Sequence, residues 1–194
     1  MAHLKNYMKK ISWPLSASLI IVSLLVGVAI GYWLTPEYQQ SMYEKNSMDL
    51  GRADRSLDLR YINAMAAHHR GAMLLAEQAA KQSQRKEIKD LAQEILANEP
   101  TAINELYQWK KDWYKDSRTA RDPIVAKLGN YDDKFDLRFL NALIAHHELG
   151  ILMAKEARTK SSRAEILNNA DAVEAFLNNG LNMLRKWRQD WYKI

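Results

Sequence analysis

The stretch NAMAAHHRGAMLLAEQAA, residues 63–80, has a close copy later in the chain, NALIAHHELGILMAKEAR at residues 141–158. A shift of 78 positions aligns residues 58–115 with residues 136–193 without a gap, and each aligned segment ends in a similar motif, WKKDWYK or WRQDWYK. Two copies are too few for a solenoid. We interpret the repeat as one duplicated supersecondary unit.

Each copy is predicted to contain two helices, because apolar side chains recur at steps of three and four residues. In the first copy the pattern covers residues 57–81, with Ser56 as a candidate N-cap, and continues from Ile88 to about residue 115. Pro100 lies inside the second helix and should kink or restart it, since proline lacks the backbone donor. No segment alternates with period two for long enough to be a strand.

Two helical hairpins that each carry one apolar face bury those faces most simply against each other. The sequence therefore predicts an all-α fold, a four-helix bundle of two duplicated hairpins, together with an N-terminal transmembrane helix described next. We expect the bundle domain at residues 55–194, with repeat units at 56–115 and 134–193 and a linker at 116–133.

Residues 13–34, WPLSASLIIVSLLVGVAIGYWL, contain no charged residue. As a helix they would be about 33 Å long, which is enough for a hydrocarbon core of about 30 Å. Trp13 at one border and Tyr32 and Trp33 at the other fit an interfacial aromatic belt. The segment is therefore expected to be a transmembrane anchor that contacts the lipid bilayer.

Basic residues precede this span, so residues 1–12 are expected to stay in the cytoplasm. Residues 35–54 would then be a juxtamembrane segment and the bundle domain would be periplasmic, as in a single-pass protein of the cytoplasmic (inner) membrane. A cleaved signal peptide is the alternative. It is less favoured because the apolar region exceeds about 15 residues and no clear A-x-A site follows.

The composition limits the classes of partner and chemistry. Of 28 basic residues, Lys5, Lys9 and Lys10 precede the apolar span, which leaves 25 against 23 acidic residues in the remainder. This nearly balanced charge gives no reason to expect a nucleic-acid partner. The chain has no cysteine, so disulfides and thiolate metal sites are excluded.

Four of the five histidines form two doublets, His68-His69 and His146-His147, at matching positions of the repeat. Neighbouring side chains on a helix diverge by about 100°, so one histidine of each doublet should face the core and the other a helix–helix seam. His69 and His147 lie on the apolar stripe. A twofold-like arrangement of the units would bring all four imidazoles together. The alternative is that the histidines only pack and form hydrogen bonds.

Methionines and aspartates extend the candidate site. Met65 and Met73 lie one helical turn before and after His69, and a thioether with a neutral imidazole suits a soft cation such as Cu(I). Methionines at this spacing can equally fill a core. Asp58 and Asp136 lie near helix starts, where a carboxylate suits the helix dipole; alternatively, each could accept a hydrogen bond from a metal-binding histidine of the other unit and orient it.

The sequence lacks the complete motifs of several enzyme classes. A di-iron bundle needs Glu-x-x-His on two helices, and no such tetrad occurs. HHELGI begins like a zinc-protease motif, but Ile151 stands where the second histidine belongs. No G-x-S-x-G is present. We expect no enzymatic activity. The tryptophans near the ends of the second and fourth helices are expected to close the bundle.

DLRYINAMAAHHRGAMLLA at 58–76 and DLRFLNALIAHHELGILMA at 136–154 resemble the paired D…HH motif of a bacterial family of domains of unknown function. This family has a ferritin-like four-helix fold and includes the CopM-type exported copper-binding proteins. The resemblance covers about residues 55–193. It implies a ferritin-like bundle and copper binding through histidine and methionine: Met65, His68, His69, His146, His147 and Met153.

This sequence departs from the family pattern at several positions. Leu75 and Leu143 stand where the pattern has methionine. The family's Gln, Glu and Met positions in the second helix of each unit are occupied by Glu99, Ala102 and Leu106 in the first copy and by Leu177, Gly180 and Leu184 in the second.

The sequence thus predicts an extracytoplasmic protein that binds a metal ion for buffering, storage or resistance, and copper is the favoured metal. The candidate ligands are His68, His69, His146, His147, Met65, Met73 and Met153, with Asp58 and Asp136 as candidates to orient a ligating histidine. The alternative is an envelope interaction or scaffold module whose histidine pairs are structural. A homo-oligomer is compatible with either function.

Overall fold

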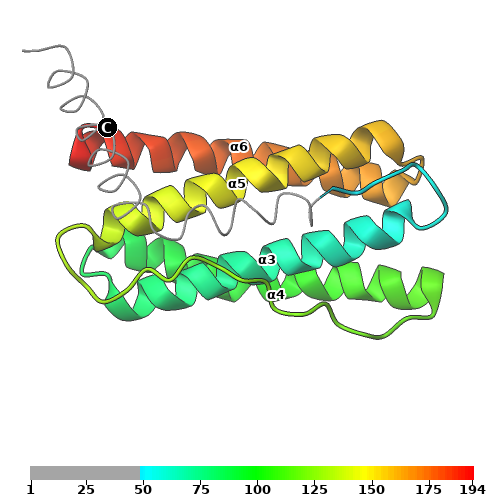
Figure 1. Cartoon of the computed structure of the whole chain (residues 1–194), viewed down its shortest axis with the longest axis horizontal. Helices are drawn as coiled ribbons and strands as arrows, with labels where there is room; N and C mark the ends of the chain where they lie inside the picture. The colour runs from blue at the N-terminus through cyan, green and yellow to red at the C-terminus, as the bar shows by residue number, and fades with distance from the viewer. Residues whose placement is uncertain (1–48) are drawn as a thin grey trace, which may run out of the picture. The chain divides into compact units, whose positions relative to one another are not determined.

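The computed structural model describes residues 49–194, which fold into two α-helical hairpins (Figure 1). The first hairpin consists of α3 (Leu57–Gln82) and α4 (Lys86–Tyr114), and the second of α5 (Phe135–Lys160) and α6 (Ala164–Tyr192). The prediction of an all-α four-helix fold is confirmed for these residues. The predicted membrane span at 13–34 lies outside them.

Helices α3 and α5 pack against each other and join the two hairpins. Figure 1 shows that α4 and α5 run in the same direction, so the linker between them must travel the length of the bundle. One long crossover of this kind is the topology of ferritin-like bundles. None of the helices within residues 49–194 is both long and apolar enough to cross a bilayer.

Each hairpin turn is three residues long and is built around a serine. Ser83 leaves the helix in an extended conformation, and its hydroxyl accepts a hydrogen bond from the Arg85 backbone N–H at 3.1 Å. Ser161 and Arg163 repeat this arrangement at the same distance. The two hairpins therefore turn in the same way because the sequence repeats Ser-x-Arg at both turns.

Two local expectations are met only in part. Helix α4 continues through Pro100 without restarting, so the first unit has one long second helix. Ser56 occupies the N-cap position of α3, but its side chain makes no capping hydrogen bond. Its carbonyl instead accepts the Arg60 backbone N–H at 2.9 Å.

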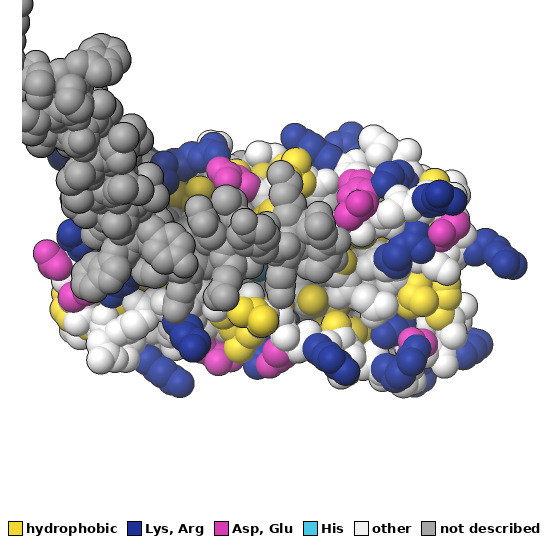
Figure 2. Space-filling model, viewed as in Figure 1, with side chains coloured by type: hydrophobic (Ala, Val, Ile, Leu, Met, Phe, Trp, Pro, Cys, Tyr) yellow, Lys and Arg dark blue, Asp and Glu magenta, His cyan; other side chains and the backbone are white. Residues whose placement is uncertain are grey.

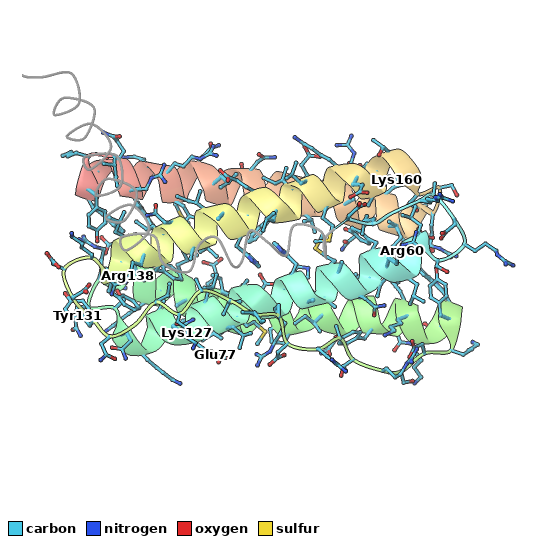
Figure 3. All side chains as sticks on the ribbon, in the orientation of Figure 1. Arg60, Glu77, Lys127, Tyr131, Arg138 and Lys160 are labelled. Carbon is cyan, nitrogen blue, oxygen red and sulfur yellow. The ribbon has the colours of Figure 1, made fainter. Side chains whose placement is uncertain are left out.

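The segment before each first helix is also part of the repeat. Arg60 Nε donates to the Leu50 carbonyl at 2.6 Å, and Arg138 Nε donates to the Leu128 carbonyl at 2.8 Å. Leu50 and Leu128 are only 1% and 2% exposed. Figure 3 shows Arg60 and Arg138 near opposite ends of the bundle, as a twofold-like relation requires. The described bundle therefore includes residues 49–54, which the sequence had assigned to a juxtamembrane segment.

Reciprocal side-chain clusters tie the start of one hairpin to the other hairpin. Asp58 accepts hydrogen bonds from Ser161 Oγ at 2.7 Å and from Arg163 Nε at 3.1 Å, and the Arg163 guanidinium lies 4.1 Å from the centroid of a Trp113 ring. The matching cluster contains Asp136, Ser83, Arg85 and Trp191. The tryptophans thus close the ends of the bundle, as predicted.

The surface in view carries charges of both signs. Figure 2 shows Lys and Arg side chains interspersed with Asp and Glu along this face of the described bundle. Ion pairs on the described bundle include Arg70 with Asp122 and Arg185 with Glu148. This mixture matches the nearly balanced charge of the sequence beyond residue 34.

Candidate metal centre

The two histidine doublets meet where α3 packs against α5. The imidazole rings of His68 and His146 are stacked, with centroids 3.9 Å apart and planes 3° from parallel. His69 lies 6.1 Å from His68, and His147 lies 6.5 Å from His146, measured between ring centroids. The stacked pair brings one histidine of each doublet together in the interior, whereas the prediction was for all four imidazoles.

Three of the imidazoles lie directly against glycines of a neighbouring helix. A Cβ atom added at Gly150 would lie 2.5 Å from His68 Nε2, and one at Gly180 would lie 2.6 Å from His147 Nε2. At Gly71 a Cβ would lie 3.0 Å from His146 Cε1. The absence of these side chains lets the rings approach the helix backbones.

These contacts define which interface each histidine occupies. His68 and His146, the first members of the doublets, lie between the hairpins at the α3–α5 interface. His147 lies within the α5–α6 hairpin, against Gly180 of α6. His69 lies within the α3–α4 hairpin and is hydrogen-bonded to Glu99 of α4. The side chains diverge as expected, but His68 and not His69 is the more buried member of its doublet, because α3 packs against both α4 and α5.

Glu99 of α4 forms a hydrogen bond with Nδ1 of His69. Both side chains are largely buried, with 13% of His69 and 14% of Glu99 exposed. The repeat places Leu177 at the position that corresponds to Glu99. Sequence reasoning recorded Glu99 as a departure from the family pattern but gave it no role, although a carboxylate on the apolar stripe of α4 was the available signal.

Burial keeps three of the imidazoles, those of His68, His146 and His147, neutral at neutral pH. It lowers the pKa of His68 well below the usual value, and neighbouring imidazoles lower it further. Burial likewise lowers the pKa of His146 to about 3, with a further contribution from His147, and the pKa of His147 to about 4. A neutral imidazole is the form that binds metal ions, so no proton has to be displaced at neutral pH.

Every histidine of the two doublets has one buried ring nitrogen without a hydrogen-bond partner: His68 Nδ1, His69 Nε2, His146 Nε2 and His147 Nδ1. A buried polar atom left without a partner costs about 1–3 kcal/mol. A bound metal ion would remove part of this cost by accepting the nitrogen lone pairs. The donor type therefore fits a copper ion.

The donor arrangement limits how such an ion could bind. Among residues 49–194, no group of three or more His, Cys, Asp or Glu side chains is placed to hold a metal ion. The lone pairs of an imidazole lie in the ring plane, so two parallel stacked rings do not point at one shared position. Binding by both His68 and His146 requires at least one ring to rotate.

The candidate methionines occupy different environments. Met65 and Met153 are almost fully buried, at 0% and 1% exposure. Met73 is partly exposed. Met65 lies three residues before His68 on the same helix, and Met153 lies seven residues after His146, so each shares a helix face with a stacked histidine.

Asp58 and Asp136 do not join the histidine cluster in the described structure. Their hydrogen bonds and ion pairs go to the hairpin turn of the opposite repeat, at Ser161 and Arg163 and at Ser83 and Arg85. The aspartates follow the first residue of their helices, about 15 Å along the axis from the histidines at 1.5 Å per residue. We therefore leave both out of the proposed site.

The bundle is similar to solved structures of CopM. The Cu(I)-bound form and the form co-crystallised with Ag are each 27% identical in sequence, with a TM-score of 0.62. Each comparison covers 70% of this chain and 97% of CopM. The apo form of CopM matches equally well, with a TM-score of 0.62 and 27% identity over 70% of this chain and 98% of CopM.

A comparison with curated proteins gives no match. The sequence model of one family matches this chain twice, at residues 58–134 and at residues 136–194. The two matches correspond to the two hairpins. The chain therefore belongs to the DUF305 family, a domain of unknown function.

Proposed function

We propose that this protein binds a copper ion, Cu(I) in the first place, within the histidine cluster at the α3–α5 interface, and serves in copper buffering, storage or resistance. The observation that carries the proposal is the set of four imidazoles that each leave one buried ring nitrogen without a hydrogen-bond partner, with the pKa values of His68, His146 and His147 lowered by burial. The likeness to CopM structures that hold Cu(I) or Ag supports it.

In this proposal His68 and His146 supply the central nitrogen donors, and His69 and His147 flank them. Met65 and Met153 supply buried thioethers, while Met73 is a peripheral donor on a partly exposed face. Soft thioether and imidazole donors with a low coordination number suit Cu(I) and its analogue Ag(I). The residues act by binding and enclosing the ion, without a catalytic step.

The cellular setting is part of the same proposal. An apolar segment at residues 13–34, preceded by basic residues, supports a single-pass anchor in the cytoplasmic membrane with the bundle on the periplasmic side. Copper held outside the cytoplasm would be kept from cytoplasmic proteins.

A titration of the full chain in detergent with Cu(I) and Ag(I) tests the binding. In the variant His68→Phe with His146→Phe, the stacked rings are kept but the nitrogen donors are lost, so the affinity should fall by at least about tenfold. His3→Ala, which alters the one histidine outside the two doublets, is the matched control. Equal affinity of the wild type and the Phe variant for Cu(I) and Ag(I) would contradict the proposal.

A scaffold role with purely structural histidines is the second candidate, and the close packing of imidazoles on glycines favours it. The two functions differ in their response to metal. A ligand that binds only the folded state raises the melting temperature. An unchanged melting temperature with copper or silver in excess would favour the scaffold.

A further inference from the structure

The two halves of the histidine cluster differ at one buried position. In the first repeat, Glu99 of α4 bonds to His69, the second histidine of its doublet. In the second repeat, Leu177 of α6 stands at the corresponding position, and the Nδ1 atom of His147 has no partner. The duplicated unit has therefore kept the histidine in both copies and a carboxylate partner in one.

The hydrogen bond to Glu99 determines how His69 presents its ring. In its ionised form the Glu99 carboxylate only accepts hydrogen bonds, so a neutral His69 bonded to it donates from Nδ1–H. The lone pair is then on Nε2, which is buried and has no hydrogen-bond partner. His69 is thus fixed in the tautomer and the orientation that leave Nε2 available inside the bundle.

We propose that Glu99 is a positioning residue that prepares His69 to bind the metal ion. The inference rests on the proposed copper-binding function and deepens it. A carboxylate bonded to the far nitrogen of an imidazole fixes the ring and makes the near nitrogen a stronger donor. Since Leu177 offers no such bond to His147, the two doublets are not equivalent, and the first repeat supplies the prepared donor.

A purely structural role for the Glu99–His69 bond makes different predictions. A structural bond would stabilise the α3–α4 hairpin, but the affinity for the ion would not depend on whether residue 99 can accept a hydrogen bond from His69. A positioning role requires that the effect of Glu99 on affinity pass through His69. The test therefore combines affinity with a direct measure of the His69 tautomer.

The experiment uses the full chain in detergent and four variants: Glu99→Leu, Glu99→Gln, His69→Leu and the double variant His69→Leu with Glu99→Leu. Leu is the residue that the second repeat carries at this position, so the fold should accept it, and circular dichroism checks this. Glu105→Leu, on the exposed face of α4, is the matched control. Imidazole ¹⁵N shifts of the metal-free protein report the tautomer, and Ag(I) and Cu(I) titrations report affinity.

The expected result has three parts. Glu99→Leu should lose the single Nδ1–H tautomer of His69 and bind both ions about 10–100-fold more weakly. Glu99→Gln should restore the tautomer and most of the affinity, because its amide oxygen accepts the same hydrogen bond. In the His69→Leu background, Glu99→Leu should have no further effect on affinity.

Other outcomes overturn the inference. It fails if Glu99→Leu binds as tightly as wild type, if Glu99→Gln binds as weakly as Glu99→Leu, or if Glu99→Leu still weakens binding when His69 is absent. In all three cases the wild type still binds, so the proposed function stands. If the wild type binds neither Ag(I) nor Cu(I), the proposed function itself is wrong and the inference falls with it.

Discussion

Gly150 of α5 lies so close to His68 of α3 that a Cβ atom on the glycine would come within 2.5 Å of His68 Nε2. The same Cβ would lie 2.5 Å from Leu177 Cδ1. Gly150→Ala should therefore lower the free energy of unfolding by about 1–2 kcal/mol, because overpacking outweighs the gain in helix propensity of about 1 kcal/mol. Urea unfolding followed by circular dichroism measures the change.

Gly71→Ala is the companion variant. Its Cβ would lie 3.0 Å from His146 Cε1, a tight contact that small shifts can relieve. Its loss of stability should be smaller than that of Gly150→Ala. A Gly150→Ala protein as stable as wild type would show that the His68 ring does not need the space that the glycine leaves.

Stability should depend on pH through the buried histidines. In the unfolded chain a histidine has a pKa of about 6.5, whereas the folded pKa is about 3 for His146 and about 4 for His147. The unfolded chain thus takes up protons that the folded chain excludes. The free energy of unfolding should be at its plateau above about pH 7 and fall continuously between about pH 6.5 and about pH 4.

Unfolding by urea at several pH values in this window measures the slope. Hydrogen bonds from Arg60 and Arg138 lower the pKa values of Asp54 and Asp132, so these carboxyl groups act mainly at lower pH. The variant His68→Phe with His146→Phe should have a shallower slope. Identical slopes in the variant and the wild type would contradict the assignment to these histidines.

The Arg163–Trp113 contact should couple the two hairpins energetically. The Arg163 guanidinium lies 4.1 Å from the ring centroid, and its side chain is 39% exposed, so its contribution is reduced by solvent. A double-mutant cycle with Arg163→Ala and Trp113→Leu should give a coupling energy of about 0.5–1 kcal/mol. A cycle of Arg163→Ala with Trp191→Leu, at the opposite cluster, should give a value near zero. Equal couplings in the two cycles would refute the assignment.

Residues 49–54 should contribute to folding although the sequence had placed them outside the bundle. Leu50 is 1% exposed, and its backbone N–H donates to Glu156 of α5 at 3.3 Å. Leu50→Ala should therefore cost about 2–4 kcal/mol of the free energy of unfolding, and Leu128→Ala a similar amount. Ile124→Ala, at a linker residue that is 71% exposed, should change stability by less than about 0.5 kcal/mol. A Leu50→Ala protein as stable as wild type would show that residues 49–54 do not contribute to the stability of the bundle.

The helical fold could be read from the sequence because the repeat and the three- and four-residue periodicity are local patterns. The meeting of His68 and His146 also followed, since a twofold relation between the units places matching residues opposite each other. The predicted helix boundaries of the first unit differed from the observed ones by at most two residues. Pro100 was overestimated as a breaker because the helix is held by its packing against α3, which propensity does not include.

The features that sequence reasoning missed depend on contacts between the hairpins. Asp58 was assigned toward a histidine, but Ser161 and Arg163 of the other repeat lie closer to it. The role of Glu99 required knowing that α4 turns this residue toward His69. Nor did periodicity show that Gly150 and Gly180 leave room for imidazoles, because a glycine in a helix carries no sign of what lies against it.

The stacking of His68 on His146 places equivalent residues of the two copies face to face. This is the geometry of an isologous dimer, in which one surface recognises itself, here contained in a single polypeptide. In a true homodimer, every substitution would occur on both sides of the axis at once. Because the two copies are joined in one chain, this restriction does not apply. An acidic residue, Glu99, can therefore face one doublet while an aliphatic residue, Leu177, occupies the equivalent position in the other copy.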